Sequence, residues 1–114
     1  MVRGAVRGAL RGAFATAVMT GAYVAQPHRP LPPEQVSKRM GIGAWPLTHL
    51  AIGITLGAIH EHVPVKRVPF GLAVWAASYA TALPVLGLYP SLRKDPPLRA
   101  ASGAVAHAVF GALL

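Results

Sequence analysis

Two stretches decide the fold: residues 40–60, MGIGAWPLTHLAIGITLGAIH, and residues 68–92, VPFGLAVWAASYATALPVLGLYPSL. Neither contains Lys, Arg, Asp or Glu. Each is long enough for a helix that crosses roughly 30 Å of hydrocarbon, which takes about 20 residues. A helix on a soluble core would carry a polar stripe that repeats every 3.6 residues, and neither stretch has one. We therefore expect both to be membrane-spanning helices.

Two further uncharged runs lie at residues 12–28 and 100–114. The first becomes long enough to span if Arg7 and Arg11 lie inside the helix and extend their side chains to the nearer interface. Its basic, acid-free beginning also resembles a signal peptide with a small-residue cleavage site at residues 20–22, but we expect it to remain as the first helix. The last run is the shortest, and a tilted short span, a re-entrant segment or the truncated end of a longer protein would each fit it.

The composition and the placement of charge agree with a membrane location. Hydrophobic residues make up 54% of the chain and charged residues 12%, against about 25% charged in soluble domains. Basic residues flank the uncharged runs and do not interleave with aromatic residues, which favours anionic lipid over nucleic acid as the partner of the +8 net charge. The expected headgroup contacts are Arg3, Arg7, Arg11, Lys38 and Arg39. The absence of cysteine excludes disulfides and thiolate metal sites.

The sequence thus predicts one all-α transmembrane domain over residues 1–114, a four-helix bundle. The expected spans cover about residues 5–26, 43–60, 68–89 and 98–114. The first loop has prolines, then Glu34, then basic residues, which predicts a short interfacial helix over about residues 33–40 with Val36 and Met40 facing the apolar side. The other loops are short and contain proline, so neighbouring spans should form antiparallel hairpins.

An even number of spans places both termini on one side of the membrane. Five basic residues then lie on that side and six in the other loops, so the count alone does not choose an orientation. The cluster of Arg3, Arg7 and Arg11 favours a cytoplasmic N-terminus, because the first helix usually dominates. We expect a multi-pass protein of the bacterial inner (cytoplasmic) membrane.

Small residues form a continuous face along the first helix. They recur every four residues at Gly4, Gly8, Gly12, Thr16 and Thr20. The second and fourth spans add Gly53, Gly57, Gly103 and Gly111. Faces of this kind let two helices approach closely, and we favour packing inside the bundle over a dedicated dimer face.

A weak internal repeat relates the two halves of the chain. ATAVMTG at residues 15–21 and ATALPVLG at residues 80–87 each precede prolines, a Pro-Pro pair and a histidine followed four residues later by glycine. Two duplicated helical hairpins would make His49 and His107 equivalent. Counted from the residues that mark the membrane boundaries, however, the two histidines differ in depth by about 6 Å. Both alternatives are left open by the sequence.

His49 and His107 are the candidate intramembrane polar residues, each on a helix face with glycines. Such residues act as haem ligands, proton relays or polar ligand contacts. The alternative is a neutral imidazole that is hydrogen-bonded to an adjacent span. The expected partners are then Thr16, Thr20, Ser78, Tyr79 and Thr81.

The third span carries two more candidate features. Trp75 and Tyr79 share a helix face, and Pro84 removes a backbone hydrogen bond, which we expect to free a carbonyl near Gly87 and kink the helix. The sequence His-Glu-His at residues 60–62 lacks the four-residue spacing of two zinc ligands on a helix, so we interpret it as a solvated turn and assign no metal site. No catalytic nucleophile, base and acid can be assembled from the few Ser, Glu and Asp residues.

The order of these features resembles the YagU-like group of uncharacterised bacterial inner-membrane proteins. The small-residue first helix with ATAVMTG, the proline-rich loop, FGLAVW at residues 70–75 and PVLGLYP at residues 84–90 carry the resemblance. Its most prominent positions here are His49, Trp75, Pro84, Gly87, Pro90 and His107. The resemblance implies a multi-span inner-membrane protein without an assigned enzymatic reaction.

Three functions fit the sequence. The first is a non-enzymatic small membrane protein, either an accessory subunit of a larger complex or a homo-oligomer packed through the glycine faces, with no catalytic residue and no cofactor. The second is a small transport or proton-conducting bundle that uses His49 and His107. The third is a redox subunit with haem b between the two histidines. Lipid and other copies or subunits are the expected partners, and nucleic acid is not.

Overall fold

The computed structural model describes residues 2–25, 32–41 and 43–114, and within these ranges every regular element is helical. The helices are α1 (Val2–Val24), α2 (Pro32–Arg39), α3 (Trp45–His60), α4 (Arg67–Ala77), α5 (Leu83–Val85) and α6 (Pro97–Leu113). A π-helical turn, η1 (Ser78–Ala82), joins α4 to α5 into one continuous helix from Arg67 to Val85. The all-α fold class is thus confirmed.

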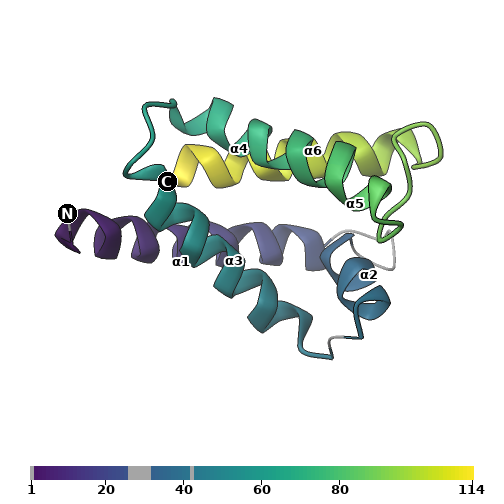
Figure 1. Ribbon diagram of the computed structural model, residues 1–114, viewed down its shortest axis with the longest axis horizontal. Helices are drawn as coiled ribbons and strands as arrows, with labels where there is room; N and C mark the ends of the chain where they lie inside the picture. Colours follow the sequence, from purple (N-terminus) through teal and green to yellow (C-terminus); the bar gives the residue numbers. More distant parts are fainter. Residues whose placement is uncertain (1, 26–31, 42) are drawn as a thin grey trace.

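The long helices form two antiparallel pairs that lie next to one another; α1, α4 and α6 follow the long axis of the molecule, and α3 crosses α1 obliquely (Figure 1). The first hairpin pairs α1 with α3, and the second pairs α4 with α6. Helix α1 also packs on α6, where Ala15 and Met19 meet Ala106 and Phe110 in the buried core. Both termini and the α3–α4 connection lie at one end, and α2 lies at the other end (Figure 1).

Glycines set the closeness of the first hairpin. Gly8 and Gly12 of α1 lie directly against Gly53 and Gly57 of α3, backbone on backbone. A methyl group added to Gly12 would meet the carbonyl oxygen of Gly53, and one added to Gly57 would meet that of Gly8. The small-residue face of α1 is therefore used inside the chain, whereas Gly4 has open space beside it.

The second hairpin repeats the same crossing with one glycine pair. A methyl group on Gly71 would meet the carbonyl oxygen of His107, and one on Gly111 would meet that of Arg67. The two central glycines of each hairpin are related in the same way: each one faces the carbonyl oxygen of the residue four positions before the other glycine. The pair Gly12 and Gly57 of the first hairpin therefore corresponds to the pair Gly71 and Gly111 of the second.

Because the glycine pairs of the two hairpins correspond, the positions of His49 and His107 can be compared relative to these pairs. His49 precedes the crossing glycine Gly57 by eight residues, whereas His107 precedes Gly111 by four. The histidines are therefore not equivalent, as a strict duplication would require, but lie one helical turn, about 6 Å, apart relative to the crossing. The boundary-based expectation of an offset agrees with the structure.

The distortion caused by Pro84 lies on the opposite side from the expected one. A proline ring clashes with the carbonyl four residues earlier, so the backbone disturbance falls before Pro84 and not near Gly87. Here the chain widens into the π turn, in which Leu83 N–H donates to the carbonyl of Ser78. The hydroxyl of Ser78 donates to the carbonyl of Val74 at 2.6 Å. The helix then ends at Val85, four residues before the predicted end of this span.

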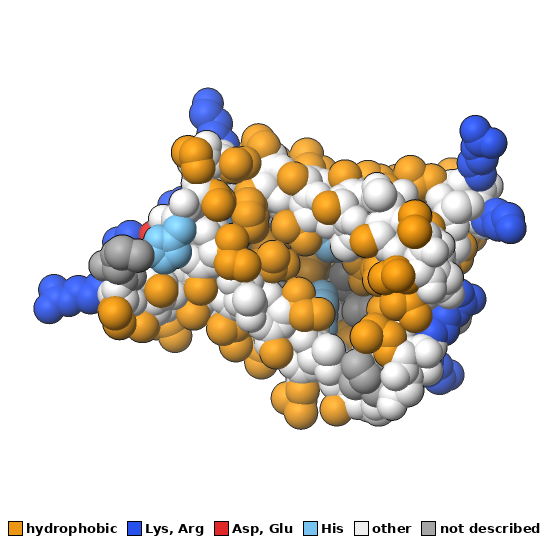
Figure 2. Space-filling model, in the orientation of Figure 1, with side chains coloured by type: hydrophobic (Ala, Val, Ile, Leu, Met, Phe, Trp, Pro, Cys, Tyr) orange, Lys and Arg blue, Asp and Glu red, His pale blue; other side chains and the backbone are white. Residues whose placement is uncertain are grey.

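Apolar side chains cover the outside of the bundle, and charges gather at its two ends (Figure 2). Exposed large hydrophobic residues include Val6, Leu10, Phe14, Ile52, Leu72, Val105 and Val109. In the described part of the chain one helix, the 19 residues of Arg67–Val85, is both long and apolar enough to cross a membrane. Helix α1 is longer but contains three arginines, and α3 and α6 have 16 and 17 residues.

Candidate functional site

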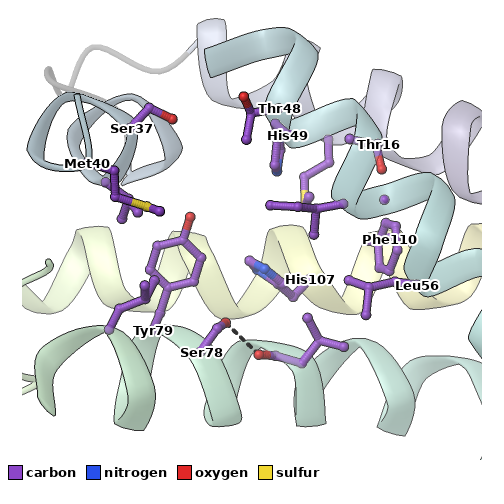
Figure 3. Close-up of a pocket in the computed structure, with 16 residues that line it drawn as sticks. Thr16, Ser37, Met40, Thr48, His49, Leu56, Ser78, Tyr79, His107 and Phe110 are labelled. Atoms are coloured by element: carbon purple, nitrogen blue, oxygen red, sulfur yellow. Dashed lines mark hydrogen bonds between the residues drawn. The ribbon is translucent and has the colours of Figure 1, made fainter. Parts of the chain in front are cut away.

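A cavity of about 250 Å³ lies between the two hairpins and next to α2 (Figure 3). Seven polar side chains line it alongside apolar ones. The polar residues are Thr16, Ser37, Thr48, His49, Ser78, Tyr79 and His107. The apolar side chains are Met19, Val36, Met40, Ile52, Leu56, Val74, Leu83 and Phe110. Among the described residues, the backbone of Gly53 also contributes to the lining. The structure thus brings His49, His107 and Tyr79, three of the five residues predicted to form a polar site, to one cavity.

His107 comes to the cavity from the second hairpin. Its side chain is buried, and its Nδ1 lies 2.7 Å from the carbonyl oxygen of Gly103, one turn earlier on α6. A carbonyl oxygen only accepts hydrogen bonds, so Nδ1 carries the proton and donates it. The ring of Tyr79 meets the imidazole edge-on, with 5.5 Å between ring centres. The hydrogen bond to Gly103 and the ring contact with Tyr79 therefore fix the orientation of the imidazole.

His49 comes to the cavity from the first hairpin, opposite His107 (Figure 3). Its Nδ1 lies 3.0 Å from the hydroxyl oxygen of Thr20 on α1, one of the five expected hydrogen-bond partners. The ring of Trp45 lies 6.3 Å away, centre to centre. His49 therefore combines the expected interhelical hydrogen bond with a position on the cavity wall.

Helix α2 closes one side of the cavity. Val36 and Met40 were expected to face the bilayer, but both line the cavity, together with the buried Ser37. Two hydrogen bonds attach α2 to the second hairpin: Arg39 donates to the carbonyl of Gly87 at 3.0 Å, and Arg99 donates to Gln35 at 3.4 Å. Because Gly87 has a φ of 72°, which favours glycine, the turn after α5 can present its carbonyl to α2. Arg39, assigned to lipid headgroups, thus has a protein partner.

A buried charged cluster, which the sequence did not reveal, lies beside the cavity. Arg99 pairs with Asp95 at 2.5 Å, and both side chains are largely buried, at 15% and 3% exposure. The guanidinium also lies over the ring of Tyr89, 5.3 Å from its centre. Burial, followed by the nearby Asp95 carboxylate, raises the pKa of Tyr89 to about 12. The cluster reaches the cavity through Tyr79, whose ring centre lies 5.0 Å from that of Tyr89.

The opposite end of the first hairpin is held by an ion triad. Arg7 and Arg11 of α1 contact Glu61, which follows α3, at 2.8 and 3.3 Å. The hydrogen bond from Arg7 lowers the pKa of the Glu61 carboxyl group below its usual value. Glu61 is therefore not merely part of a solvated turn. The neighbouring His60 turns away to the carbonyl of Val65, at 3.0 Å.

The remaining predicted site residues lie outside the main cavity. Trp75 borders a second cavity of about 10 Å³, next to Asp95 and Arg99. Pro84 is not among the lining residues, although the π turn that precedes it carries Ser78 and Tyr79 into the cavity. Within the described ranges, no cluster of three His, Asp or Glu side chains is placed to hold a metal ion.

No protein-family model, curated protein or solved structure matches this chain. The resemblance to the YagU-like group therefore stays a prediction from the sequence. What the chain can do must be inferred from the cavity and its surroundings.

Proposed function

We propose that this chain is a four-span protein of the bacterial inner membrane that binds a small molecule in the cavity between its two hairpins. The observation that carries the proposal is the convergence of His49 and His107, from different hairpins, on one cavity whose wall also carries many apolar side chains. Ionisable side chains inside a membrane are costly and mark ligand or ion sites. Of the three expectations, this proposal is closest to the transport or proton-conducting bundle that uses His49 and His107.

The shape and surface of the bundle support its placement in a membrane. Its longest dimension is 41 Å, close to the 40–45 Å of a bilayer with its headgroups. Helices α1, α4 and α6 run along this axis, whereas α3 crosses it obliquely (Figure 1). The charges gather at the two ends of the axis (Figure 2). The 16 residues of α3 are about 24 Å long, so the bilayer would thin locally around this helix.

The two other expectations have less support. The glycines that suggested an oligomer are largely occupied within the chain, so an accessory or homo-oligomeric role would need packing on the outer face of α1 at residues such as Leu10 and Phe14. Haem has four pyrrole rings, and a cavity of about 250 Å³ is too small for it when a cavity of about 150 Å³ holds benzene alone. Binding of a small molecule, by contrast, requires neither an additional protein interface nor a cavity larger than the one between the hairpins.

Binding of naphthalene to the purified protein in detergent tests the proposal. We expect saturable binding at one site per chain, measured by titration calorimetry after subtraction of protein-free micelles. Val36→Trp should abolish it, because the indole fills the cavity from the α2 side. Leu47→Trp, at an outward position of α3 with 68% exposure, should leave it unchanged. Equal binding by both variants, or no saturable binding to the wild type, would contradict the proposal.

A further inference from the structure

We infer that the ligand of this cavity is an uncharged ring compound that carries a hydroxyl group and donates its proton to Nε2 of His107. The inference rests on the proposed function and specifies the ligand of the same site. It follows from the tautomer of His107, from the uncharged or neutral side chains of the described residues that line the cavity, and from the size and opening of the cavity.

The hydrogen bond of His107 selects a ligand that donates. Nδ1 carries the proton because it donates to the carbonyl of Gly103 at 2.7 Å. In a neutral imidazole the other ring nitrogen then has a lone pair and accepts. His107 lines the cavity, and Figure 3 shows its ring at the cavity wall beside Tyr79. A hydroxyl group on a bound molecule is therefore matched by an acceptor that is already oriented.

The wall of the cavity disfavours a charged ligand. Among the described residues that line it there is no Lys, Arg, Asp or Glu. A charged group would lose its hydration here without a counter-charge, which costs several kcal/mol. Ile52, Leu56 and Phe110 instead offer apolar contact. The ligand is thus mainly apolar with one or a few hydrogen-bonding groups.

The size and the opening of the cavity narrow the class further. An apolar cavity of about 150 Å³ binds benzene, so about 250 Å³ accommodates two fused rings or a substituted single ring. Figure 2 shows a hollow on the side of the molecule with histidine at its bottom and hydrophobic side chains around it. In the proposed orientation this hollow opens towards lipid. Uncharged phenol-like compounds dissolve in lipid and reach the site by that route.

Three probes of nearly equal shape test the inference: 1-naphthol, its methyl ether 1-methoxynaphthalene, and the 1-naphthoate anion. We expect 1-naphthol to bind the wild type about fivefold to tenfold more tightly than naphthalene or the ether. The reason is that one additional net hydrogen bond increases the binding affinity by about this factor. Naphthoate should not bind. In His107→Phe, 1-naphthol should bind no better than naphthalene.

The outcomes separate the two proposals. Absence of saturable binding by naphthalene and by 1-naphthol would contradict the proposed function itself. Binding of naphthalene with equal affinity for naphthol and its ether would overturn only the inference about the ligand. The comparison of naphthol with its ether uses the wild-type protein, so it remains decisive if His107→Phe does not fold. Preferred binding of naphthoate would also overturn the inference.

Discussion

Gly57→Ala is expected to lower the free energy of unfolding by about 3 kcal/mol. The added methyl group would meet the backbone of Gly8 and Gly12 on α1, and backbone atoms cannot turn aside as a flexible side chain can. The hairpin must open or shift along its whole contact, and the small-residue packing that holds membrane helices together is lost. Reversible unfolding in mixed micelles, followed by circular dichroism, measures the change.

Gly4→Ala is the matched control for this prediction. Gly4 lies in α1 with nothing within 4 Å of the added methyl group. Alanine is favoured over glycine inside a helix, so this variant should be as stable as the wild type or gain about 0.5–1 kcal/mol. If Gly57→Ala were as stable as Gly4→Ala, the close glycine crossing would not hold the first hairpin together.

Asp95→Asn should destabilise the protein by about 3 kcal/mol. The carboxylate is 3% exposed and neutralises Arg99, whose guanidinium is also held against Tyr89 and Gln35. Loss of the negative charge leaves a largely buried cation without compensation, and this costs more than the pair itself contributes. The same unfolding measurement in micelles applies.

The double variant Asp95→Asn with Arg99→Met distinguishes an uncompensated charge from a general loss of packing. Because methionine removes the buried cation, the double variant should be more stable than Asp95→Asn alone. Arg93→Ala, at an exposed position in the same loop, should change stability by no more than about 0.5 kcal/mol. A double variant that is less stable than the single one would show that Arg99 is held by other contacts.

The sequence predicted the helices well because their signals are local. Uncharged runs, flanking charges and prolines defined four long helices and a short one, and the four-residue glycine spacing indicated a face for close packing. The bounds differ most at the third long helix, which ends at Val85 instead of residue 89. At this point the positive φ of Gly87, 72°, turns the chain out of the helix. The residues after Val85 are mostly apolar, so the uncharged run continued past the end of the helix and did not indicate where it ends.

The site could be predicted only in part, because it depends on contacts between distant segments. His49 and His107 were found from their chemistry, and the boundary residues already indicated an offset of about one turn. That both side chains reach one cavity depends on how the two hairpins pack, which the sequence alone does not give. The cluster of Asp95 and Arg99 had one local signal, the four-residue spacing of opposite charges, but that spacing does not show that the pair is buried. Val36 lies on the side of α2 that faces protein and not lipid. An amphipathic pattern indicates an apolar side of a helix, but it does not distinguish protein from lipid as the surroundings of that side.

Labelling of single cysteines tests whether the chain forms a four-span bundle. The chain has no cysteine, so His62→Cys in the α3–α4 connection and Arg93→Cys in the α5–α6 connection introduce unique labels at exposed positions. A maleimide that cannot cross membranes is added to intact bacterial cells and, separately, to permeabilised cells. With a cytoplasmic N-terminus, we predict that Arg93→Cys is labelled in intact cells and His62→Cys only after permeabilisation. Equal labelling of the two positions from one side would contradict the account.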